Sequence, residues 1–270
     1  MKMKHNPISI FILDVSNSSA EDMGDELTLY LDAMVEWISI WTKDIGPVKV
    51  KHRAGDEIIF VGNGYSTAYI IAFYVSRFWK YRNHKPYFGL SFGDIDRELE
   101  EVDIETWIHP LIKQARYAND LLKQAQNRPP FKFELDQFYL GDRNIPVLYN
   151  QFRYEFETLF NTILQLQHTL IKDQTNIQEL VCSLYLILQQ QKAVGELLGK
   201  TAPTISSHFK KGKSEEVLRT FNEMINVLNS LQKNTNLGIA DNPMETSEML
   251  HDSIRNHLKE NINLLLPNER

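Results

Sequence analysis

KHRAGDEIIFVG, residues 51–62, is the stretch that decides the fold, because it places a polar turn directly before a buried strand. Gly55 stands in the turn, and the apolar run Ile58–Val61 follows it. Gly and Asp both favour tight turns, so the stretch predicts a β-hairpin. The acidic pair Asp56 and Glu57 has two interpretations. It serves a solvated turn, or it forms half of a metal or nucleotide site whose other half lies elsewhere in the chain.

Strands and helices alternate on both sides of this hairpin. ISIFILDV (Ile8–Val15) is a short apolar run, which is typical of a buried central strand. Apolar residues from Leu27 to Trp41 recur at helical spacing. The remaining expected elements are a largely buried helix at Tyr65–Arg82, a strand at Tyr87–Ile95, a helix at Asp103–Gln126 with Pro110 near its first turn or at a kink, and a strand at Phe131–Leu140.

The resulting order, β-α-β-β-α-β-α-β over residues 7–145, predicts an α+β fold built on a ferredoxin-like split β-α-β sandwich. GDRNIP (Gly141–Pro146) is the expected linker to a helical domain at residues 146–235. Residues 236–270 are expected to form a loop and an amphipathic helix. The longer helices expected after the linker are Val147–Lys172, Ile177–Gln190, Glu215–Gln232 and Ser247–Leu266.

Composition limits the class of protein. The 270 residues are 43% hydrophobic and 11% aromatic, which is ordinary for a folded globular chain. A single cysteine, Cys182, excludes an internal disulfide framework and a zinc site made of several cysteines. No apolar run is long enough to span a membrane, and Asp14 ends the short run near the N-terminus. We therefore expect a cytoplasmic protein without a membrane partner.

Two aspartates are expected to meet at one edge of the sheet. Asp14 ends the first strand, and Asp56 lies in the hairpin. In a split β-α-β fold these strands can be neighbours, and two adjacent carboxylates are tolerated where a divalent cation neutralises them. Because Mg²⁺ is commonly held by one or two carboxylates together with phosphate oxygens, Asp14 and Asp56 are candidate ligands of Mg²⁺ or Mn²⁺.

These segments resemble a known superfamily. FILDVSNSS and RAGDEIIFV are similar to the two metal-carrying segments of the nucleotide cyclase and GGDEF superfamily, FGLSFGDI is similar to its next strand, and IKQARYANDLLKQA to its later helix. From end to end the chain resembles the bacterial SatD family, which carries a C-terminal helix-turn-helix. The resemblance implies a cyclase-like first domain, and it implies that Arg116 is a candidate phosphate contact.

The chain also departs from the cyclase pattern. The asparagine that precedes the arginine by four positions in cyclases is Ile112 here, and the doubled glycine of diguanylate cyclases is Ala54-Gly55. No base-selecting residues are evident in the sequence. We therefore expect the first domain to be a degenerate cyclase-like domain that senses a nucleotide or supports oligomerisation.

QKAVGELLGKTAPTISSHFKKG (residues 191–212) predicts a helix-turn-helix. Gly195 is small where two helices must cross closely, and Gly199 suits a left-handed helix end. Thr201 is a plausible N-cap of the second helix. Apolar residues then point inward and polar residues outward, which is the order expected of a DNA-reading helix.

Charge agrees with this interpretation. Residues 190–215 carry five lysines and two glutamates, a local charge of +3 in a chain whose net charge is -6. Lysines contact phosphates, while hydroxyls and histidine reach base edges. The candidate DNA-binding residues are Lys192, Lys200, Thr201, Thr204, Ser206, Ser207, His208, Lys210 and Lys211. The alternative is an ordinary helical corner that makes a protein contact.

The sequence thus predicts a DNA-binding transcriptional regulator whose partners are double-stranded DNA, a possible nucleotide ligand and a second copy of the chain. The apolar face of residues 216–231 is expected to pack in the core or to form the dimer seam. The alternative function is a Mg²⁺- or Mn²⁺-dependent nucleotidyl cyclase or related nucleotidyl transferase. A third possibility is an interaction protein that uses both domains as docking surfaces.

Overall fold

The computed structural model describes residues 6–16, 24–53, 55–135, 152–235 and 242–266. Among them the chain is an α+β protein with one five-stranded sheet and ten α-helices. The strands are β1 (Asn6–Val15), β2 (Val48–His52), β3 (Ile58–Asn63), β4 (Pro86–Ile95) and β5 (Phe131–Phe133). No helix in this part of the chain is long and apolar enough to cross a membrane.

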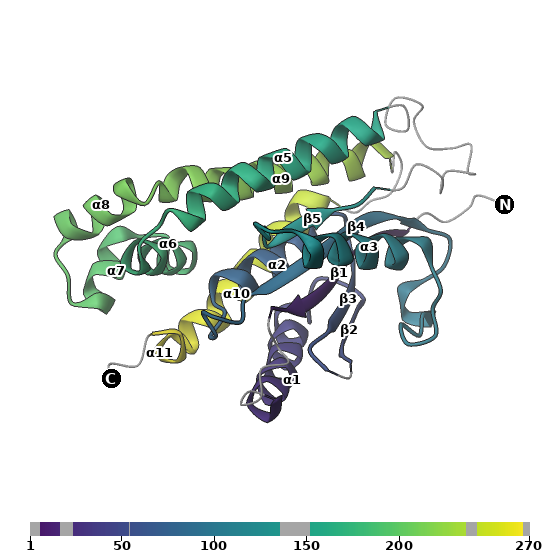
Figure 1. The fold of residues 1–270 in the computed structure, drawn as a ribbon, viewed down its shortest axis with the longest axis horizontal. Helices are drawn as coiled ribbons and strands as arrows, with labels where there is room; N and C mark the ends of the chain where they lie inside the picture. The colour runs from purple at the N-terminus through teal and green to yellow at the C-terminus, as the bar shows by residue number, and fades with distance from the viewer. Residues whose placement is uncertain (1–5, 17–23, 54, 136–151, 236–241, 267–270) are drawn as a thin grey trace.

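The helices of the first half are α1 (Gly24–Trp41), α2 (Thr67–Arg77) and α3 (Pro110–Gln124), with a short 3-10 helix at Leu99–Glu101. The helices of the second half are α5 (Arg153–Lys172), α6 (Asn176–Leu188), α7 (Gln191–Leu198), α8 (Ala202–Lys211), α9 (Ser214–Thr235), α10 (Pro243–Glu260) and α11 (Ile262–Leu265). Figure 1 shows α6, α7 and α8 gathered at one end of the molecule, away from the sheet.

The strands are arranged in the order β2-β3-β1-β4-β5. β1 is antiparallel to β3 on one side and to β4 on the other, and β4 and β5 are the only parallel pair among the described strands. The hairpin of β2 and β3 is the one expected from residues 51–62. Helix α3 covers one face of β1 and helices α1 and α2 cover the other, which explains its nearly unbroken apolar run.

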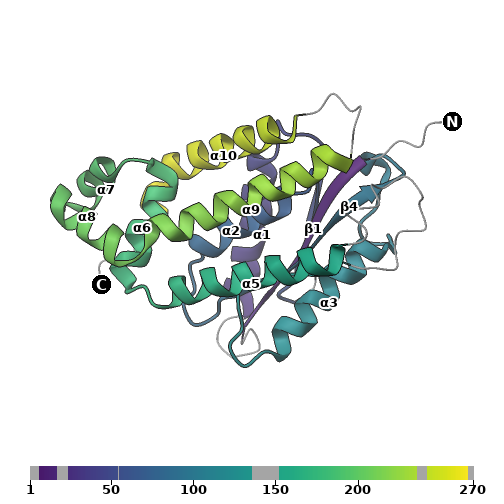
Figure 2. The ribbon, with the colours of Figure 1, turned by 90° about the horizontal axis from the view of Figure 1, so that it is seen from above.

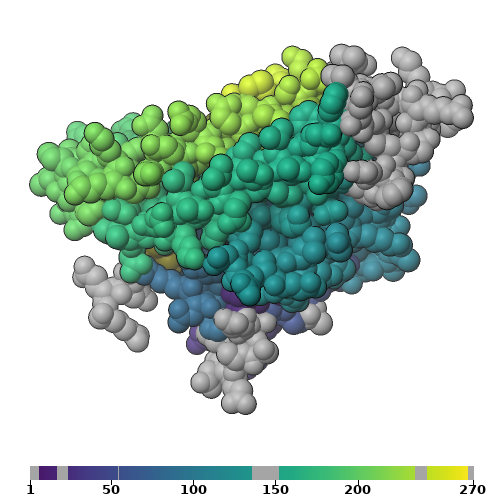
Figure 3. All heavy atoms as spheres, turned by 45° about the horizontal axis from the view of Figure 1, so that its top comes forward, coloured from purple at the N-terminus to yellow at the C-terminus, as the bar shows by residue number. Residues whose placement is uncertain are grey.

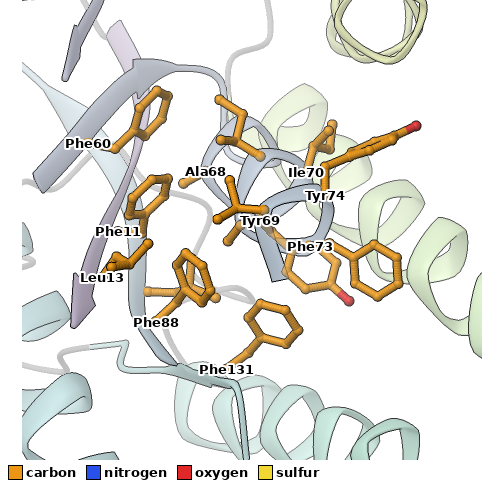
Figure 4. Close-up of a cluster of buried hydrophobic side chains, with 14 of the residues drawn as sticks. Phe11, Leu13, Phe60, Ala68, Tyr69, Ile70, Phe73, Tyr74, Phe88 and Phe131 are labelled. Atoms are coloured by element: carbon orange, nitrogen blue, oxygen red, sulfur yellow. The ribbon is translucent and has the colours of Figure 1, made fainter. Parts of the chain in front are cut away.

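Alternate residues of β1 enter two different cores. Ile10 and Ile12 belong to a cluster with Leu111 and Ala115 of α3. Phe11, Leu13 and Val15 point to the opposite face of the sheet. There they pack with α1 and α2 in a larger, aromatic-rich cluster. Figure 4 shows this larger cluster between the sheet and α2.

The second-half helices pack against the outer side of α2. Phe221 of α9 stacks on Phe73 of α2 with ring centroids 3.9 Å apart, and Tyr69 lies 5.6 Å from the same ring. α5, α6 and α10 contribute residues to the same aromatic-rich cluster. In Figure 2, α5, α9 and α10 lie over α2 as a layer. One continuous core therefore joins the sheet to the helices.

Several expected boundaries differ from the observed ones. The third helix begins at Pro110 and not near Asp103, because residues before it form a turn and Pro occupies the first helical position. The last strand is described only as Phe131–Phe133. The expected linker Gly141–Pro146 lies outside the described residues, so the division at residue 145 stays a prediction.

Candidate functional site

Asp14 lies at the end of β1 opposite Tyr87 of β4. Only 7% of the surface of Asp14 is exposed to solvent. The side chain of Asp56, in the β2–β3 turn, hydrogen-bonds to it, so the two aspartates meet. Burial and then the hydrogen bond to Asp56 raise the pKa of Asp14, while the ammonium of Lys123 acts in the opposite direction.

Lys123 of α3 is the cation that contacts this pair. Its Nζ donates to Oδ2 of Asp14 at 2.5 Å. The hydrogen bond to Asp14 raises the pKa of Lys123, and the charges of Asp14, Asp56 and Asp120 add to this effect. The ammonium therefore supplies positive charge beside the two carboxylates that were expected to share a metal ion.

Glu57 binds the arginine that was expected to face phosphate. Arg116 of α3 donates from Nη1 to Oε2 of Glu57 at 2.7 Å and from Nη2 to Oε1 at 3.0 Å. This bidentate hydrogen bond raises the pKa of Arg116. Arg53 approaches the same carboxylate at 3.3 Å and also donates to the carbonyl of Ile104 at 2.8 Å. Glu57 thus holds two guanidinium groups at once.

The cluster therefore carries three carboxylates and three cations. Two aspartates would suit Mg²⁺ or Mn²⁺ where a nucleotide supplied the remaining oxygen ligands. Among the described residues, however, no group of three or more His, Cys, Asp or Glu side chains could hold a metal ion. The donor set fits a metal only in part, because Lys123 already binds Asp14.

Lys123 was not expected in this site, and Glu57 was expected only as part of the acidic pair of the turn, not as the partner of Arg116. Lys123 follows Arg116 by seven residues, which is two helical turns, so both side chains lie on one face of α3. That spacing is the signal that would have identified Lys123 from the sequence. Tyr87 is a further neighbour of Asp14. The guanidinium carbon of Arg128 lies over the ring of Tyr87, 4.6 Å from the ring centroid.

The helix-turn-helix is formed by α7 and α8, with α6 packed against both. Ile205 of α8 and Val194 of α7 are fully buried in a small core with Val181 and Leu184 of α6. Gly199 ends α7 with a φ of 61°, as expected for a left-handed helix end. A Cβ at Gly195 would lie 2.9 Å from the carbonyl oxygen of Lys200, which explains the small residue at the crossing.

The candidate DNA-binding residues lie on the outer side of this motif. Seven of them are exposed and two, Thr204 and His208, are partly exposed; the exposed ones are Lys192, Lys200, Thr201, Ser206, Ser207, Lys210 and Lys211. Thr201 occupies the N-cap position of α8. Its hydroxyl bonds to the hydroxyl of Thr204 at 2.9 Å and caps no backbone amide, so the expected capping bond is absent at that residue.

α10 supports the turn that precedes the motif. Gln189 takes a left-handed conformation between α6 and α7, with a φ of 56°. Arg255 of α10 donates to the carbonyl of Leu186 at 3.3 Å. With its amide oxygen turned inward, Gln189 accepts from the same guanidinium at 2.8 and 2.9 Å. The orientation of α7 is therefore tied to α10.

The apolar face that follows α8 packs in the core. Val217, Phe221, Met224, Ile225 and Leu228 of α9 are all buried. Of the two uses expected for residues 216–231, the described structure has core packing. The buried residues of this face are therefore not available to a second copy of the chain.

No protein-family model matches the chain. No curated protein and no solved structure is significantly similar to it either. The two candidate sites are therefore interpreted from their own residues, contacts and charges.

Proposed function

We propose that the protein is a DNA-binding transcriptional regulator that reads DNA with α8. The observation that carries this proposal is the division of α8 into two faces. Ile205 is fully buried against α6 and α7, while Ser206 and Ser207 beside it are exposed. Small hydroxyl residues on an exposed helix can enter the major groove, and they can bond to base edges there.

Charge and position support the same function. Lys210 and Lys211 follow the hydroxyl residues, and Lys200 lies in the turn before them. These cations would contact phosphates on either side of the groove. Helices α7 and α8 also project at one end of the molecule, so a duplex can approach them without meeting the sheet (Figure 1).

We propose that the first half is a ferredoxin-like, cyclase-like sensor or oligomerisation unit, in line with the resemblance to the SatD family. The element order β-α-β-β-α-β and the sheet order β2-β3-β1-β4 support this proposal. The ion pairs of Lys123 with Asp14 and of Arg116 with Glu57 favour a degenerate site. Arg116, the candidate phosphate contact, and Lys123, the cation beside the aspartates, are both bound to carboxylates of the protein.

The direct test is binding to genomic DNA fragments, followed by anisotropy titrations on a selected fragment. The double variant K210A/K211A should weaken binding similarly on all sequences, and it should reduce the slope of log K against log salt by about 2. Ser207→Ala should instead alter the preferred sequence. The control is K51A/K113A, which removes two exposed lysines on the sheet side of the molecule, one on β2 and one on α3, and should leave the salt slope unchanged. Absence of salt-sensitive, sequence-selective binding by the wild type would refute the proposal.

A second candidate function is a Mg²⁺- or Mn²⁺-dependent nucleotidyl cyclase or related nucleotidyl transferase. The hydrogen bond between the side chains of Asp14 and Asp56 favours it, because both candidate ligands lie together. A bound divalent ion would neutralise phosphate charge and activate the attacking oxygen. In this function Asp14 and Asp56 would hold the ion, and Arg116 would leave Glu57 to bind phosphate.

Incubation with each nucleoside triphosphate and Mn²⁺ tests this second function. Product from the wild type that disappears in Asp56→Asn would support it. No product, or product that persists in Asp56→Asn, would count against it. DNA binding is measured separately on the same samples, so the two functions stand or fall independently.

A further inference from the structure

An apolar stripe runs along the surface of α5. Its members recur in alternating steps of four and three residues, which is the heptad spacing of a coiled-coil helix. They are Phe152, Phe156, Leu159, Ile163, Leu166 and Leu170, here called the α5 seam. Leu159 is 56% exposed, Leu166 63%, Phe152 40% and Ile163 37%. Exposed apolar residues of this size are unremarkable singly, but a continuous row of them marks an interaction surface.

The seam borders the face that α5 uses for the core of its own chain, but most of it lies outside that face. Arg153, Phe160, Leu164 and Gln167 are the buried residues of α5. Phe156 and Leu170 of the seam are partly buried against the same core. The seam is therefore held rigidly along one edge while Leu159, Ile163 and Leu166 face solvent. Figures 2 and 3 show α5 on the outside of the molecule, where a second helix can reach it.

We propose that the α5 seam is the interface of a homodimer in which α5 packs antiparallel to α5 of a second copy. The two-fold axis is perpendicular to α5 and crosses it at the level of Asn161. Each seam residue of one copy then meets a seam residue of the other copy. Leu159 of one copy faces Ile163 of the other, Phe156 faces Leu166, and Phe152 faces Leu170. Such self-complementarity is what a two-fold interface requires, because each contact then occurs twice.

The charges of α5 favour a second copy over a charged partner. Between Glu157 and Lys172 the helix carries no Asp, Glu, Lys or Arg. His168 adds no charge at neutral pH, since burial lowers its pKa. On α5 itself an acidic or basic helix would therefore find no opposite charge along the seam. Lys132 of β5 is a cation that another element places beside it, in a hollow that Leu166 also lines. Antiparallel copies place no like charges opposite each other there, and their helix dipoles are opposed favourably.

The interface is tested by sedimentation equilibrium on the full chain. We expect a dimer for the wild type at micromolar concentrations, and a monomer for L159E/L166E. Both substituted residues are exposed, so the melting temperature of the monomeric variant reports whether its fold is intact. The matched control T158E/Q165E adds the same charge to exposed positions on another face of α5 and should remain dimeric.

The two outcomes that overturn the proposal are a wild type that stays monomeric up to about 100 μM and a dimer that L159E/L166E leaves intact. The first would leave the seam to a different protein, and the second would place the dimer interface elsewhere. Neither result depends on DNA binding.

Spin labels test the antiparallel direction. Thr162 and Thr169 lie on the same flank of the seam, and the native Cys182 is fully buried, so introduced cysteines can be labelled selectively. Antiparallel packing about Asn161 separates the two copies of residue 162 by about 3 Å along the helix axis and those of residue 169 by about 24 Å. Equal label distances at the two positions would indicate parallel helices and refute this arrangement.

Discussion

At the scale of single residues, Gly89 is the position where α3 crosses β4 most closely. A Cβ at Gly89 would lie 2.0 Å from the carbonyl oxygen of Ala115 and 2.5 Å from the backbone nitrogen of Asn119. Both atoms belong to the backbone of α3, so they cannot move without shifting the helix. Gly89→Ala should therefore destabilise the fold by about 3 kcal/mol or more, measured by urea denaturation.

Gly93→Ala is the matched control for this prediction. The nearest atom to a Cβ there is Cδ2 of Leu111 at 3.1 Å, which is the end of a flexible side chain. We expect this variant to lose about 1 kcal/mol or less. Equal destabilisation by the two substitutions would show that the approach of α3 to Gly89 does not limit the packing.

Lys123 should compete with divalent cations for Asp14. In Lys123→Met the ammonium is lost while the two aspartates remain beside each other, so the affinity for Mn²⁺ should rise by about tenfold or more. Calorimetric titration of Mn²⁺ into both proteins measures the change. Lys113→Met, which removes an exposed lysine of the same helix, should bind Mn²⁺ like the wild type. An unchanged or weaker affinity in Lys123→Met would mean that the lysine does not occupy the cation position.

The sequence predicted part of this cluster. A strand end and a hairpin turn on neighbouring strands bring Asp14 and Asp56 together whatever their rotamers, so their proximity followed from topology alone. The ion pairs of Lys123 and Arg116 depend on how α3 is rotated and where long side chains turn. The seven-residue spacing places both cations on one face of α3, but no local pattern determines which carboxylate each of them binds.

At the scale of secondary-structure elements, α10 connects the sheet-side helices to the helix-turn-helix. His257 accepts a hydrogen bond from Nε1 of Trp41 in α1 at 3.0 Å, and Nδ1 of His251 lies 3.1 Å from the hydroxyl of Tyr74 in α2. Arg255 reaches the end of α6. α10 therefore spans both halves, and it uses buried or partly buried histidines to do so.

His251 makes the fold sensitive to acid. Burial, aided by the charge of Arg255, lowers its pKa to about 3. The unfolded chain binds a proton near pH 6.5, whereas the folded chain does not, so stability is complete above pH 6.5 and falls as the pH is lowered toward 3. At pH 4.5 the loss from His251 alone should be about 2–3 kcal/mol.

Urea denaturation at several pH values measures this loss. In His251→Gln the free energy of unfolding should fall by about 2–3 kcal/mol less between pH 6.5 and pH 4.5 than in the wild type. This difference is expected even if the variant is less stable than the wild type at every pH. The residual slope is expected to include His109, whose pKa burial lowers to about 4. A profile of the same steepness in both proteins would mean that His251 is protonated in the folded state.

Element types were predictable where the apolar period was clear, and element ends were not. The helix-turn-helix was predicted closely because Gly199 marks a backbone conformation that few other residues adopt, with a φ of 61°. The apolar spacing of α9 is compatible with core packing and with a dimer interface, so the sequence alone did not decide between them. In α5 the sequence does not distinguish the buried apolar face from the exposed one, because their residues are neighbours in the chain. Leu159 is exposed and Phe160 is buried, and only the structure separates them.

At the scale of the whole molecule, α2 is the element on which both halves depend. Ten of its eleven residues are buried. The sheet covers one side of α2, and α9 and α10 cover the other with Phe221 and His251. An α2 without the second half would expose a wide aromatic surface, including Phe73 and Tyr69.

The isolated fragment 1–145 should therefore not fold as a stable unit. Fully burying one large apolar side chain contributes about 1.5–3 kcal/mol, so losing the cover over Phe73, Tyr69 and Tyr74 removes a large part of a typical domain stability of about 5–15 kcal/mol. We expect the fragment to bind a hydrophobic dye and to lack a cooperative urea transition. Mixing it with fragment 146–270 should restore that transition, because the two halves then rebuild one core. A cooperative transition of the lone fragment at the midpoint of the full chain would instead establish an autonomous sheet domain, to which the helices are only appended.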